Sequence, residues 1–327
     1  MLTILTYHEI DQKQWQELSQ SSIVATWFQT DEAYRFYQSV GGMQAFAYGV
    51  SEEGRLTGVV VGYTTQEKCK FKQHFTCRTI IYGGPLLADD ISEEALATLL
   101  KAIRRQGDKA IYVETRNFHD YSRWKSVFTH SGFTYQPHYD IHVHCNDTHN
   151  ISRRRQRELK RAITNGAIVC EAQSEQEVRE WYLILSQLYR EKVRTPLFSV
   201  DFFLQFYRNK VGKYLLVKHE GKIIGGMMCP ILEGKAIYEW YVCGADEEYK
   251  ELYPSVVATH AAIEYAKTNR LPLFDFMGAG NPYEAYGVRD FKMEFGGELV
   301  EHGRYLCVRK PMLYRIGKMG VKWLKRK

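Results

Sequence analysis

The sequence predicts an α/β (α+β) chain of two similar domains, each a mixed, mostly antiparallel sheet flanked by helices. Three observations lead to this prediction. The chain has 327 residues, and a single compact core rarely grows past about 250–300 residues. A hairpin pattern containing two glycines occurs twice. Each copy is followed by the same order of strand, helix and strand.

The two hairpins span Ala45–Tyr63 and Lys213–Ile231. Each consists of an apolar run, a charged turn containing Glu-Gly, and a second apolar run. This pattern is typical of a tight hairpin between half-buried strands. The glycines that match between the copies are Gly54 with Gly221 and Gly58 with Gly225.

A third apolar strand follows each hairpin, at residues 79–87 and 236–244, and a helix follows each of these strands. The first helix has Ser92 as its N-cap and Gly107 at its end. The second begins at Pro254, a residue suited to a first helical turn. A further apolar strand follows each helix, so the order of elements predicts a duplicated domain.

The predicted first domain is 1–148 and the predicted second domain is 149–310. The tail 311–327 is basic and amphipathic, and we expect either that it packs back on the first domain or that it docks on a membrane surface. In a helical projection its apolar side chains stand against its lysines: Ile316, Met319 and Trp323 against Lys318, Lys322 and Lys325.

The segment 151–192 is predicted to be a helical hairpin that opens the second domain. Its first helix is capped by Ser152, and six of the nine residues from Arg153 to Arg161 are basic. One interpretation is a stripe that binds phosphates, and the other is a solvated face paired with acids. The side chains predicted to bind tRNA or phosphate are Arg153, Arg154, Arg157 and Arg161.

Composition narrows the class of protein. The net charge of +6 favours anionic partners. The seven cysteines are scattered without a C-x-x-C pair, which argues against a zinc knuckle and indicates a reducing, cytoplasmic location. There is no signal-peptide pattern and no apolar run long enough to cross a membrane.

Four histidines invite a metal interpretation: His138, His142, His144 and His149. No acidic or cysteine partner stands at ligand spacing in the sequence, so no metal site is predicted. The sequence also predicts no cofactor.

The second half resembles the FemABX family, peptidoglycan-bridge aminoacyltransferases with two tandem GNAT-like domains. The resemblance is best over residues 150–310, and its most specific motif is Gly-Val-x-x-Phe-Lys-x-x-Phe-Gly-Gly at Gly287–Gly297. The helix after Pro254 and an Asp-Phe-x-Gly strand end support it. The resemblance implies transfer of an amino acid from aminoacyl-tRNA to an amine of a nucleotide- or lipid-linked peptidoglycan precursor.

Lys292 matches the lysine of this motif, and the resemblance implies that its charge stabilises the oxyanion of the tetrahedral intermediate. Phe291 matches the adjacent aromatic residue, which implies a place in the acceptor site. An amine can attack an activated ester directly once the two are oriented, so the chemistry requires no serine or cysteine nucleophile.

Other candidates for the site come from the residues themselves. Asp275 stands at a strand end where Gly278 lets the backbone approach a ligand, so it could orient or deprotonate the attacking amine. Strand alternation places Glu239 and Tyr241 on one face, which we expect to line the cleft. Arg289 could pair with a substrate phosphate or carboxylate.

Two departures from the family leave alternatives open. Tyr37 stands near the position of a family lysine used on the sugar nucleotide, and residues 151–192 leave no room for a coiled-coil arm. The residues before Pro254 also lack the glycine-rich loop with which ordinary GNAT enzymes bind a coenzyme A diphosphate, which argues against the use of acyl-CoA. The alternatives are a CoA-dependent N-acyltransferase of the GNAT superfamily and a non-catalytic module that binds tRNA or a membrane surface.

Overall fold

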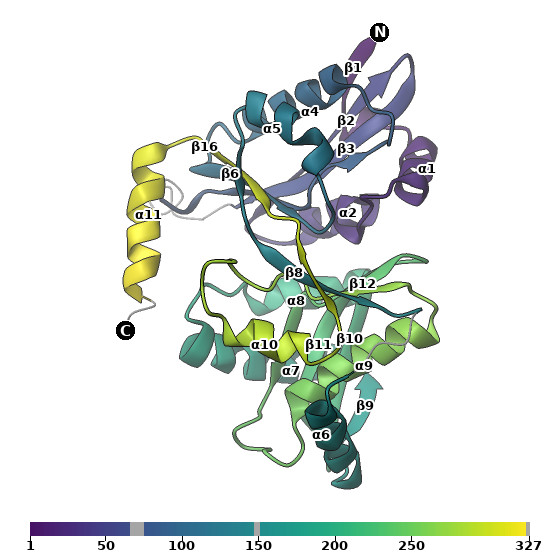
Figure 1. Cartoon of the computed structure of the whole chain (residues 1–327), viewed down its shortest axis with the longest axis vertical. Helices are drawn as coiled ribbons and strands as arrows, with labels where there is room; N and C mark the ends of the chain where they lie inside the picture. The colour runs from purple at the N-terminus through teal and green to yellow at the C-terminus, as the bar shows by residue number, and fades with distance from the viewer. Residues whose placement is uncertain (66–74, 147–150, 325–327) are drawn as a thin grey trace. The chain divides into compact units, whose positions relative to one another are not determined.

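The computed structural model describes residues 1–65, 75–146 and 151–324, with the backbone alone for 321–324. The chain forms two compact units (Figure 1). The first unit is Met1–His138 with Glu301–Lys327, and the second is Tyr139–Val300. Among the described residues, no helix combines the length and apolar character needed to cross a lipid bilayer.

The first unit contains a mixed sheet with strand order β1-β2-β3-β4-β6-β16-β7, in which β5 also pairs with β3. Its strands are β1 (Leu2–Thr6), β2 (Met43–Glu52), β3 (Arg55–Thr65), β4 (Thr79–Gly83), β5 (Leu86–Leu87), β6 (Tyr112–Asn117), β7 (Thr134–Gln136) and β16 (Arg304–Val308). Its helices are η1 (Tyr7–Glu9), α1 (Gln12–Ser21), η2 (Trp27–Gln29), α2 (Asp31–Ser39), α4 (Glu93–Gln106), η3 (Ser122–Trp124), α5 (Lys125–His130) and α11 (Pro311–Leu324).

The core of the first unit lies between one face of this sheet and the helices α4 and α5. Leu96, Leu99 and Leu100 recur on the inner side of α4 at helical spacing, and they pack in one cluster with Ile81 and Val113 of the sheet. Ser92 caps α4 by accepting a hydrogen bond from the backbone N–H of Ala95 at 3.1 Å. Burial of this apolar stripe is what fixes the helix on the sheet.

The second unit contains a sheet with strand order β15-β8-β14-β12-β11-β10-β9, in which β13 also pairs with β11. Its strands are β8 (Tyr139–His144), β9 (Ile168–Glu171), β10 (Gly212–His219), β11 (Lys222–Leu232), β12 (Ala236–Tyr238), β13 (Tyr241–Gly244), β14 (Leu273–Asp275) and β15 (Glu298–Glu301). Its helices are α6 (Arg153–Thr164), α7 (Glu175–Leu188), η4 (Tyr189–Val193, a π-helix), α8 (Val200–Asn209), α9 (Pro254–Thr268) and α10 (Gly287–Met293).

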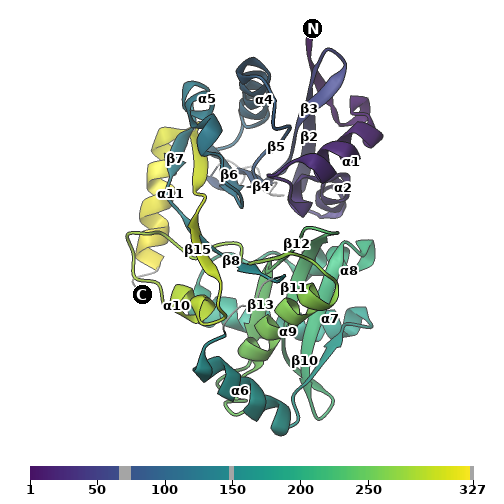
Figure 2. The same cartoon turned by 45° about the vertical axis from the view of Figure 1, so that its right-hand side comes forward.

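Helices cover both faces of the second sheet, with α9 in front of β10 and β11 in Figure 2. Leu215 and Val217 point from β10 into the core beneath α9. Tyr214 points to the opposite face, where its ring contacts Trp181 of α7 with centroids 5.2 Å apart. The alternation along β10 therefore assigns one face to α6 and α9 and the other to α7 and α8.

The two units repeat the same order of elements, and the third strand is broken in both. In the first unit β4 pairs in parallel with β6 while β5 returns to β3. In the second, β12 pairs in parallel with β14 while β13 pairs with β11. Both hairpins also carry a register shift, after Val50 and after Val217. The predicted fold class, with mixed and mostly antiparallel sheets flanked by helices, is confirmed.

The segment 151–192 differs from the predicted helical hairpin. A strand, β9, lies between α6 and α7 and pairs with β10. The helix α6 contributes Leu159 and Ala162 to the core beneath α9, so it packs with α9. The strand β9 (Ile168–Glu171) is short and mostly exposed, so no local pattern of apolar residues predicts it. It forms because its backbone pairs with the distant strand β10.

The predicted domain limits were 148 and 310, whereas the compact units divide at 138 and 300. The shift has a direct cause, since β8 pairs with β14 in the second sheet and β16 pairs with β6 in the first. The tail forms α11, whose Tyr314 contacts Tyr112 of β6 with ring centroids 5.5 Å apart. Lys310 donates to the carbonyl of Lys109 at 2.8 Å.

We predict that Gly225→Ala lowers the free energy of unfolding by about 1–3 kcal/mol, because overpacking strains a close-packed site. A Cβ at this position would lie 2.9 Å from the carbonyl oxygen of Cys243 and 3.0 Å from Cβ of Pro254. The control is Gly317→Ala in α11, where nothing lies within 4 Å. Urea unfolding measures both variants, and equal stability of the two would contradict the prediction.

Candidate functional site

Lys292 is buried on α10 with 8% of its surface exposed. Its ammonium donates to the carbonyls of Phe276 at 2.8 Å and Gly278 at 2.9 Å. It also pairs with Oε1 of Glu239 at 2.9 Å. An ammonium has three hydrogens, and each has an acceptor within the protein. A substrate oxyanion at Lys292 would therefore have to replace one of these acceptors.

Glu239 stands at the break between β12 and β13, where neighbouring strands separate. Its backbone N–H donates to the carbonyl of Asp275 at 2.9 Å, at the end of the β12–β14 pairing. Beyond this point β13 pairs with β11. Within the described part of the chain, Oε2 of Glu239 has no hydrogen-bond partner. Burial raises the pKa of Glu239, Lys292 opposes this rise, and Asp275 adds to it.

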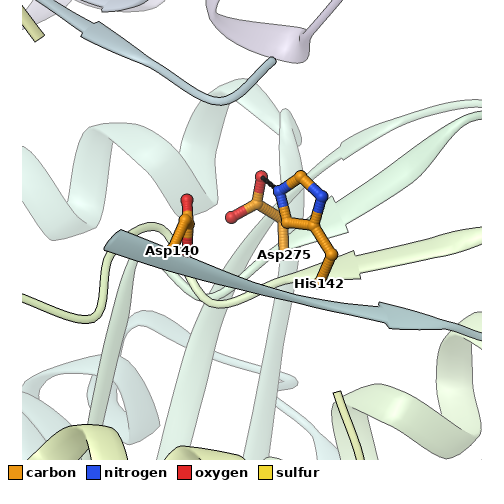
Figure 3. Close-up of side chains that lie close together, drawn as sticks. All are labelled: Asp140, His142 and Asp275. Atoms are coloured by element: carbon orange, nitrogen blue, oxygen red, sulfur yellow. Dashed lines mark ion pairs between the residues drawn. The ribbon is translucent and has the colours of Figure 1, made fainter. Parts of the chain in front are cut away.

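Asp275 ends β14 and lies beside two side chains of β8 (Figure 3). Its Oδ1 accepts a hydrogen bond from the backbone N–H of Met277 at 2.6 Å, and its Oδ2 lies 3.4 Å from Nε2 of His142. Asp140 stands two residues before His142, so both point from the same face of β8. Oδ1 of Asp140 accepts from the backbone N–H of Gly278 at 2.7 Å.

Asp140, His142 and Asp275 are buried together, and the charge of each shifts the pKa of its neighbours. Burial works to lower the pKa of His142, but the adjacent Asp275 carboxylate outweighs it and raises that pKa to about 9. Burial works to raise the pKa of Asp275, but His142 holds it below its usual value. The pKa of Asp140 is raised, first by burial and then by the charge of Asp275. At neutral pH His142 and Asp275 therefore form an imidazolium–carboxylate pair, and the field of Asp275 makes Asp140 harder to ionise.

The same cluster offers ligand atoms to a cation. One atom each from Asp140, His142 and Asp275 lie within 4.8 Å of one another, and all three residues are buried. A carboxylate–imidazole set of this kind suits several divalent metals. The spacing of residues along the sequence did not predict this cluster, because its two acids, Asp140 and Asp275, lie on strands that are far apart in the chain. The alternation in "YDIHVH" was the available signal, since it places Asp140 and His142 on one face.

The other predicted site residues fall into two groups. Gly278, at φ +130°, holds a conformation that side chains rarely adopt and contacts both Asp140 and Lys292. Arg289 donates to backbone carbonyls of its own loop, Ala279 at 2.8 Å and Asn281 at 2.6 Å. Tyr241 packs in an aromatic cluster with α8, with its ring centroid 5.0 Å from that of Phe203. Gly278 thus joins the cluster of Lys292, whereas Arg289 is held by carbonyls of its own loop and Tyr241 packs against α8.

Phe291 lies beneath a buried arginine that the sequence reasoning had not selected. The guanidinium of Arg155 sits 4.3 Å from the centroid of the Phe291 ring. It pairs with Glu158 at 2.5 Å and with Glu294 at 2.7 Å. Arg155 therefore connects α6 to the segment that carries Lys292. Its inward position follows from the spacing of Leu159, four residues later on the same side of the helix.

The predicted phosphate-binding arginines of α6 have two different environments. Arg154 pairs with Glu158 at 3.0 Å, and Arg161 pairs with Glu251. Arg153 and Arg157 are exposed and have no ion pair with any described residue. They stand four apart, and Lys160 extends the same side of the helix. This exposed side is the part of the basic segment that is available to an anion.

The segment before α9 is acidic. Asp246 accepts a hydrogen bond from the backbone N–H of Ser255 at 3.1 Å, at the start of the helix. An open cavity beside it is lined in part by Glu247, Glu248 and Glu251. A carboxylate on the helix N-terminus occupies the place that a phosphate would need. This agrees with the absence of a diphosphate loop from the sequence.

Comparison with known proteins fits this architecture. Residues 146–285 match the family model described as an acetyltransferase (GNAT) domain. A crystal structure of FemX superposes with a TM-score of 0.72 over 96% of this chain and 99% of its own, at 14% identity. The chain has a FemX-like fold of two tandem GNAT domains. No curated protein sequence matches it.

Two further structures share the tandem GNAT fold. That of L-PGS from Bacillus licheniformis covers 92% of each chain at 15% identity and a TM-score of 0.59. A tandem GNAT protein from the clavulanic acid biosynthesis pathway covers 94% of this chain and 98% of its own, at 10% identity and a TM-score of 0.56. The family resemblance in fold and the assignment to the acyltransferases are confirmed, because residues 146–285 match a GNAT acetyltransferase domain and the chain shares the fold of FemX.

We predict that the stability contributed by His142 falls as pH rises. Its pKa is about 9 in the folded protein and about 6.5 when unfolded. The folded state therefore binds the proton more tightly, and the contribution is complete below about pH 6.5 and lost through about pH 9, on the order of 3 kcal/mol. The measurement compares wild type with His142→Gln by urea unfolding from pH 6 to 9.5. Exposed His144 on the same strand supplies the control, His144→Gln, and an equal pH dependence there would refute the assignment.

Proposed function

We propose that the protein is an aminoacyltransferase that moves an amino acid from aminoacyl-tRNA to an amine of a peptidoglycan precursor. The observation that supports this best is the buried Lys292–Glu239 pair at the point where β12 and β13 separate. It combines a fixed positive charge with a carboxylate whose pKa is raised. Those are the two groups that amine attack on an ester requires. No metal or cofactor takes part in the proposed reaction.

The proposed reaction uses the pair as a coupled unit. The neutral amine attacks the ester carbonyl, forming the new C–N bond and placing negative charge on the carbonyl oxygen. Glu239 accepts the proton released by the amine through Oε2, which has no other partner among the described residues. Protonation neutralises Glu239, so the charge of Lys292 becomes available to the oxyanion. The ester C–O bond then breaks, the amide remains, and the leaving oxygen of the tRNA takes the proton back from Glu239 and departs as a hydroxyl.

The neighbouring residues have positioning roles in this proposal. Asp275 holds the backbone of Met277, and Asp140 holds that of Gly278. The carbonyls of Phe276 and Gly278 in turn hold Lys292. The acids therefore act on the reaction through the position of the lysine rather than by touching substrate.

The donor is proposed to bind along the exposed side of α6. Arg153, Arg157 and Lys160 point to solvent without ion pairs among the described residues, as a phosphate-binding surface requires. Arg154 and Arg161 were predicted to share this role, but their ion pairs with glutamates assign them a smaller part.

The acceptor is proposed to be nucleotide- or lipid-linked, and the protein to be cytoplasmic with peripheral contact at the inner face of the plasma membrane. The support for membrane contact is the outer side of α11. Met312, Ile316 and Met319 recur at i, i+4 and i+7, and they are 77%, 54% and 64% exposed. Lys318 belongs to the same helix, so the surface combines apolar and basic groups.

A second candidate function is that of a CoA-dependent N-acyltransferase, and the match of residues 146–285 to an acetyltransferase (GNAT) domain supports it. The carboxylates before α9 argue against this function, because they disfavour binding of the coenzyme A diphosphate at the start of that helix. A non-catalytic module that binds tRNA or a membrane would use the same two basic surfaces. Its Lys292–Glu239 pair would then be structural.

We predict that protein incubated with charged tRNA and precursor adds one amino-acid residue to the precursor, measured by mass spectrometry. Lys292→Met abolishes transfer, and it also costs about 3–5 kcal/mol of stability by leaving Glu239 unpaired in a buried place. The double variant Lys292→Met with Glu239→Gln is the control for folding, since it removes both charges. It should recover stability but not transfer. Normal transfer by this folded double variant would refute the catalytic role, and transfer from acyl-CoA alone would refute the donor.

We predict that Arg153→Gln with Arg157→Gln weakens tRNA binding and lowers the salt dependence by about one unit of slope for each phosphate that the helix no longer binds. The matched control is Arg154→Gln with Arg161→Gln, which removes the same charge from the same helix but from side chains already paired with glutamates. Binding is measured by fluorescence anisotropy from 50 to 200 mM salt. Equal losses of affinity in the two double variants would contradict the assignment of the exposed side.

A further inference from the structure

Arg155 joins the start of α6 to the end of α10. Its guanidinium pairs with Glu294 at 2.7 Å and lies over the rings of Phe291 and Phe295, 4.3 and 5.8 Å from their centroids. The N-cap residue of α6 adds a backbone contact, because the N–H of Ser152 donates to the carbonyl of Glu294 at 2.8 Å. An ion pair, an aromatic stack and a backbone hydrogen bond therefore hold these two helix ends together.

The helix α10 depends on such contacts for its place. It has only seven residues, Gly287–Met293, and a helix of this length is marginal by itself in water. Tyr286 stands at its N-cap, but the side chain makes no capping hydrogen bond to a described residue. Contacts with the rest of the second unit therefore fix the direction in which Lys292 points.

Arg155 contacts residues on both sides of Lys292 in the chain. Phe291 precedes the lysine and Glu294 follows it by two positions, so both lie within one helical turn of it. The ammonium itself is held by separate acceptors, in the segment after β14 and at the break after β12. Loss of Arg155 would therefore release the backbone that carries the lysine while leaving those acceptors in place.

The charge of Arg155 is buried and compensated. The residue is 5% exposed, and its Nη1 lies 2.5 Å from Glu158 of the same helix, while Nη2 reaches Glu294. A planar guanidinium can make two ion pairs and stack on a ring at the same time, which the compact ammonium of a lysine cannot do. The two carboxylates come from different parts of the chain, so one rigid group sets the distance between α6 and the end of α10.

The opposite side of α6 is the proposed donor surface. Arg153 and Arg157 are exposed there, each two residues from Arg155, and residues two apart on a helix point to different sides. One helix therefore carries both the groups proposed to bind tRNA phosphates and the group that holds α10. A phosphate backbone bound to the outside of α6 would lie at a fixed distance from the ammonium of Lys292.

We propose that Arg155 is a positioning residue that sets the register between the donor-binding side of α6 and Lys292. This role rests on the proposed function, since the register matters only if tRNA binds α6 and Lys292 acts on the ester. Arg155 touches neither the tRNA nor the reacting atoms, and it acts through the backbone of α10. Without it the donor still binds, but the ester carbonyl and the ammonium no longer meet in the orientation that transfer requires.

The kinetic test is Arg155→Lys, which keeps the positive charge but loses the planar fork and the stack. This variant should lower kcat at least about tenfold, because a small misplacement of a reacting group can cost up to about 100-fold. Its KM for charged tRNA should stay near the wild-type value, because Arg153 and Arg157 are unchanged. A wild-type kcat, or a loss confined to KM, would overturn the proposal.

The matched control is Arg208→Lys. Arg208 of α8 also joins two helices of the second unit, since it pairs with Glu175 of α7 at 2.7 and 2.8 Å. Neither helix carries a proposed site residue. This variant should keep the wild-type kcat, and a loss equal to that of Arg155→Lys would show that any such ion pair has the same effect.

Acetylation of Lys292 reports its position without any transfer reaction. The residue is 8% exposed, so in wild type it should react slowly with acetic anhydride. Arg155→Lys should raise its acetylation rate at least about tenfold, the increase in local opening expected when a charged hydrogen bond is lost. Mass spectrometry measures this rate against that of Lys218 in β10, which pairs with Glu177. A variant that merely unfolds would expose both lysines together.

Glu294→Ala guards against a loss of folding in the arginine variant. It removes the partner at the end of α10, while Arg155 keeps Glu158 as a partner, so no buried charge is left unpaired. This variant should also raise the acetylation of Lys292 relative to that of Lys218. Unchanged ratios in both variants would overturn the role of Arg155.

The acetylation measurement needs neither tRNA nor an acceptor amine. If wild type transfers nothing while the variants selectively expose Lys292, only the proposed function is refuted, and the position of the lysine still depends on Arg155. If wild type transfers, and the variants change neither kcat nor the acetylation of Lys292, only the role of Arg155 is refuted.

Discussion

The ion pair between Lys292 and Glu239 is the interaction on which the second unit's site depends. A buried lysine is costly unless its hydrogens all find acceptors, and here two of the three acceptors are carbonyls of the segment after β14. Lys292 therefore fixes the path of the backbone from Phe276 to Gly278. That path in turn presents the N–H groups that hold Asp275 and Asp140. Removal of the lysine charge would disturb all of these hydrogen bonds together.

The acids and the histidine around this pair form a balanced set. His142 compensates Asp275, Lys292 compensates Glu239, and burial together with the charge of Asp275 raises the pKa of Asp140. A change of protonation at one member alters the field at the next, because the groups lie in a region of low dielectric. Such coupling suits a reaction in which a proton leaves an amine while negative charge forms on a carbonyl oxygen.

The sequence predicts those features of the fold that depend on residues close together in the chain. The matched glycines and alternating strands predicted the repeated fold, because a tight turn and a half-buried strand each have a pattern of their own. Gly58 and Gly225 recur because each stands where a helix crowds its strand: Gly58 against Leu99 of α4 and Gly225 against Pro254 of α9. The candidate Lys292 came from a motif. Its partner in the ion pair, Glu239, was selected for a different reason, as a residue facing a cleft.

Features that depend on distant partners were missed. The place of β9 follows from pairing with β10, and two ion pairs of α6 depend on glutamates far along the chain: Arg154 with Glu294 at 3.7 Å and Arg161 with Glu251. The cluster around His142 also depends on a distant partner, because Asp275 reaches it through the pairing of β14 with β8, whereas only Asp140 lies near it in the sequence.

The first sheet contains one strand, β16, that comes from near the end of the chain, and this order affects folding during synthesis. The first sheet receives β16 only from residues 304–308, although the rest of that sheet is complete by residue 136. During synthesis the strands β6 and β7 therefore emerge long before the strand that lies between them. The ribosome must deliver nearly the entire polypeptide before the first half can close its sheet, so an arrest or cleavage near residue 300 would leave two exposed strand edges.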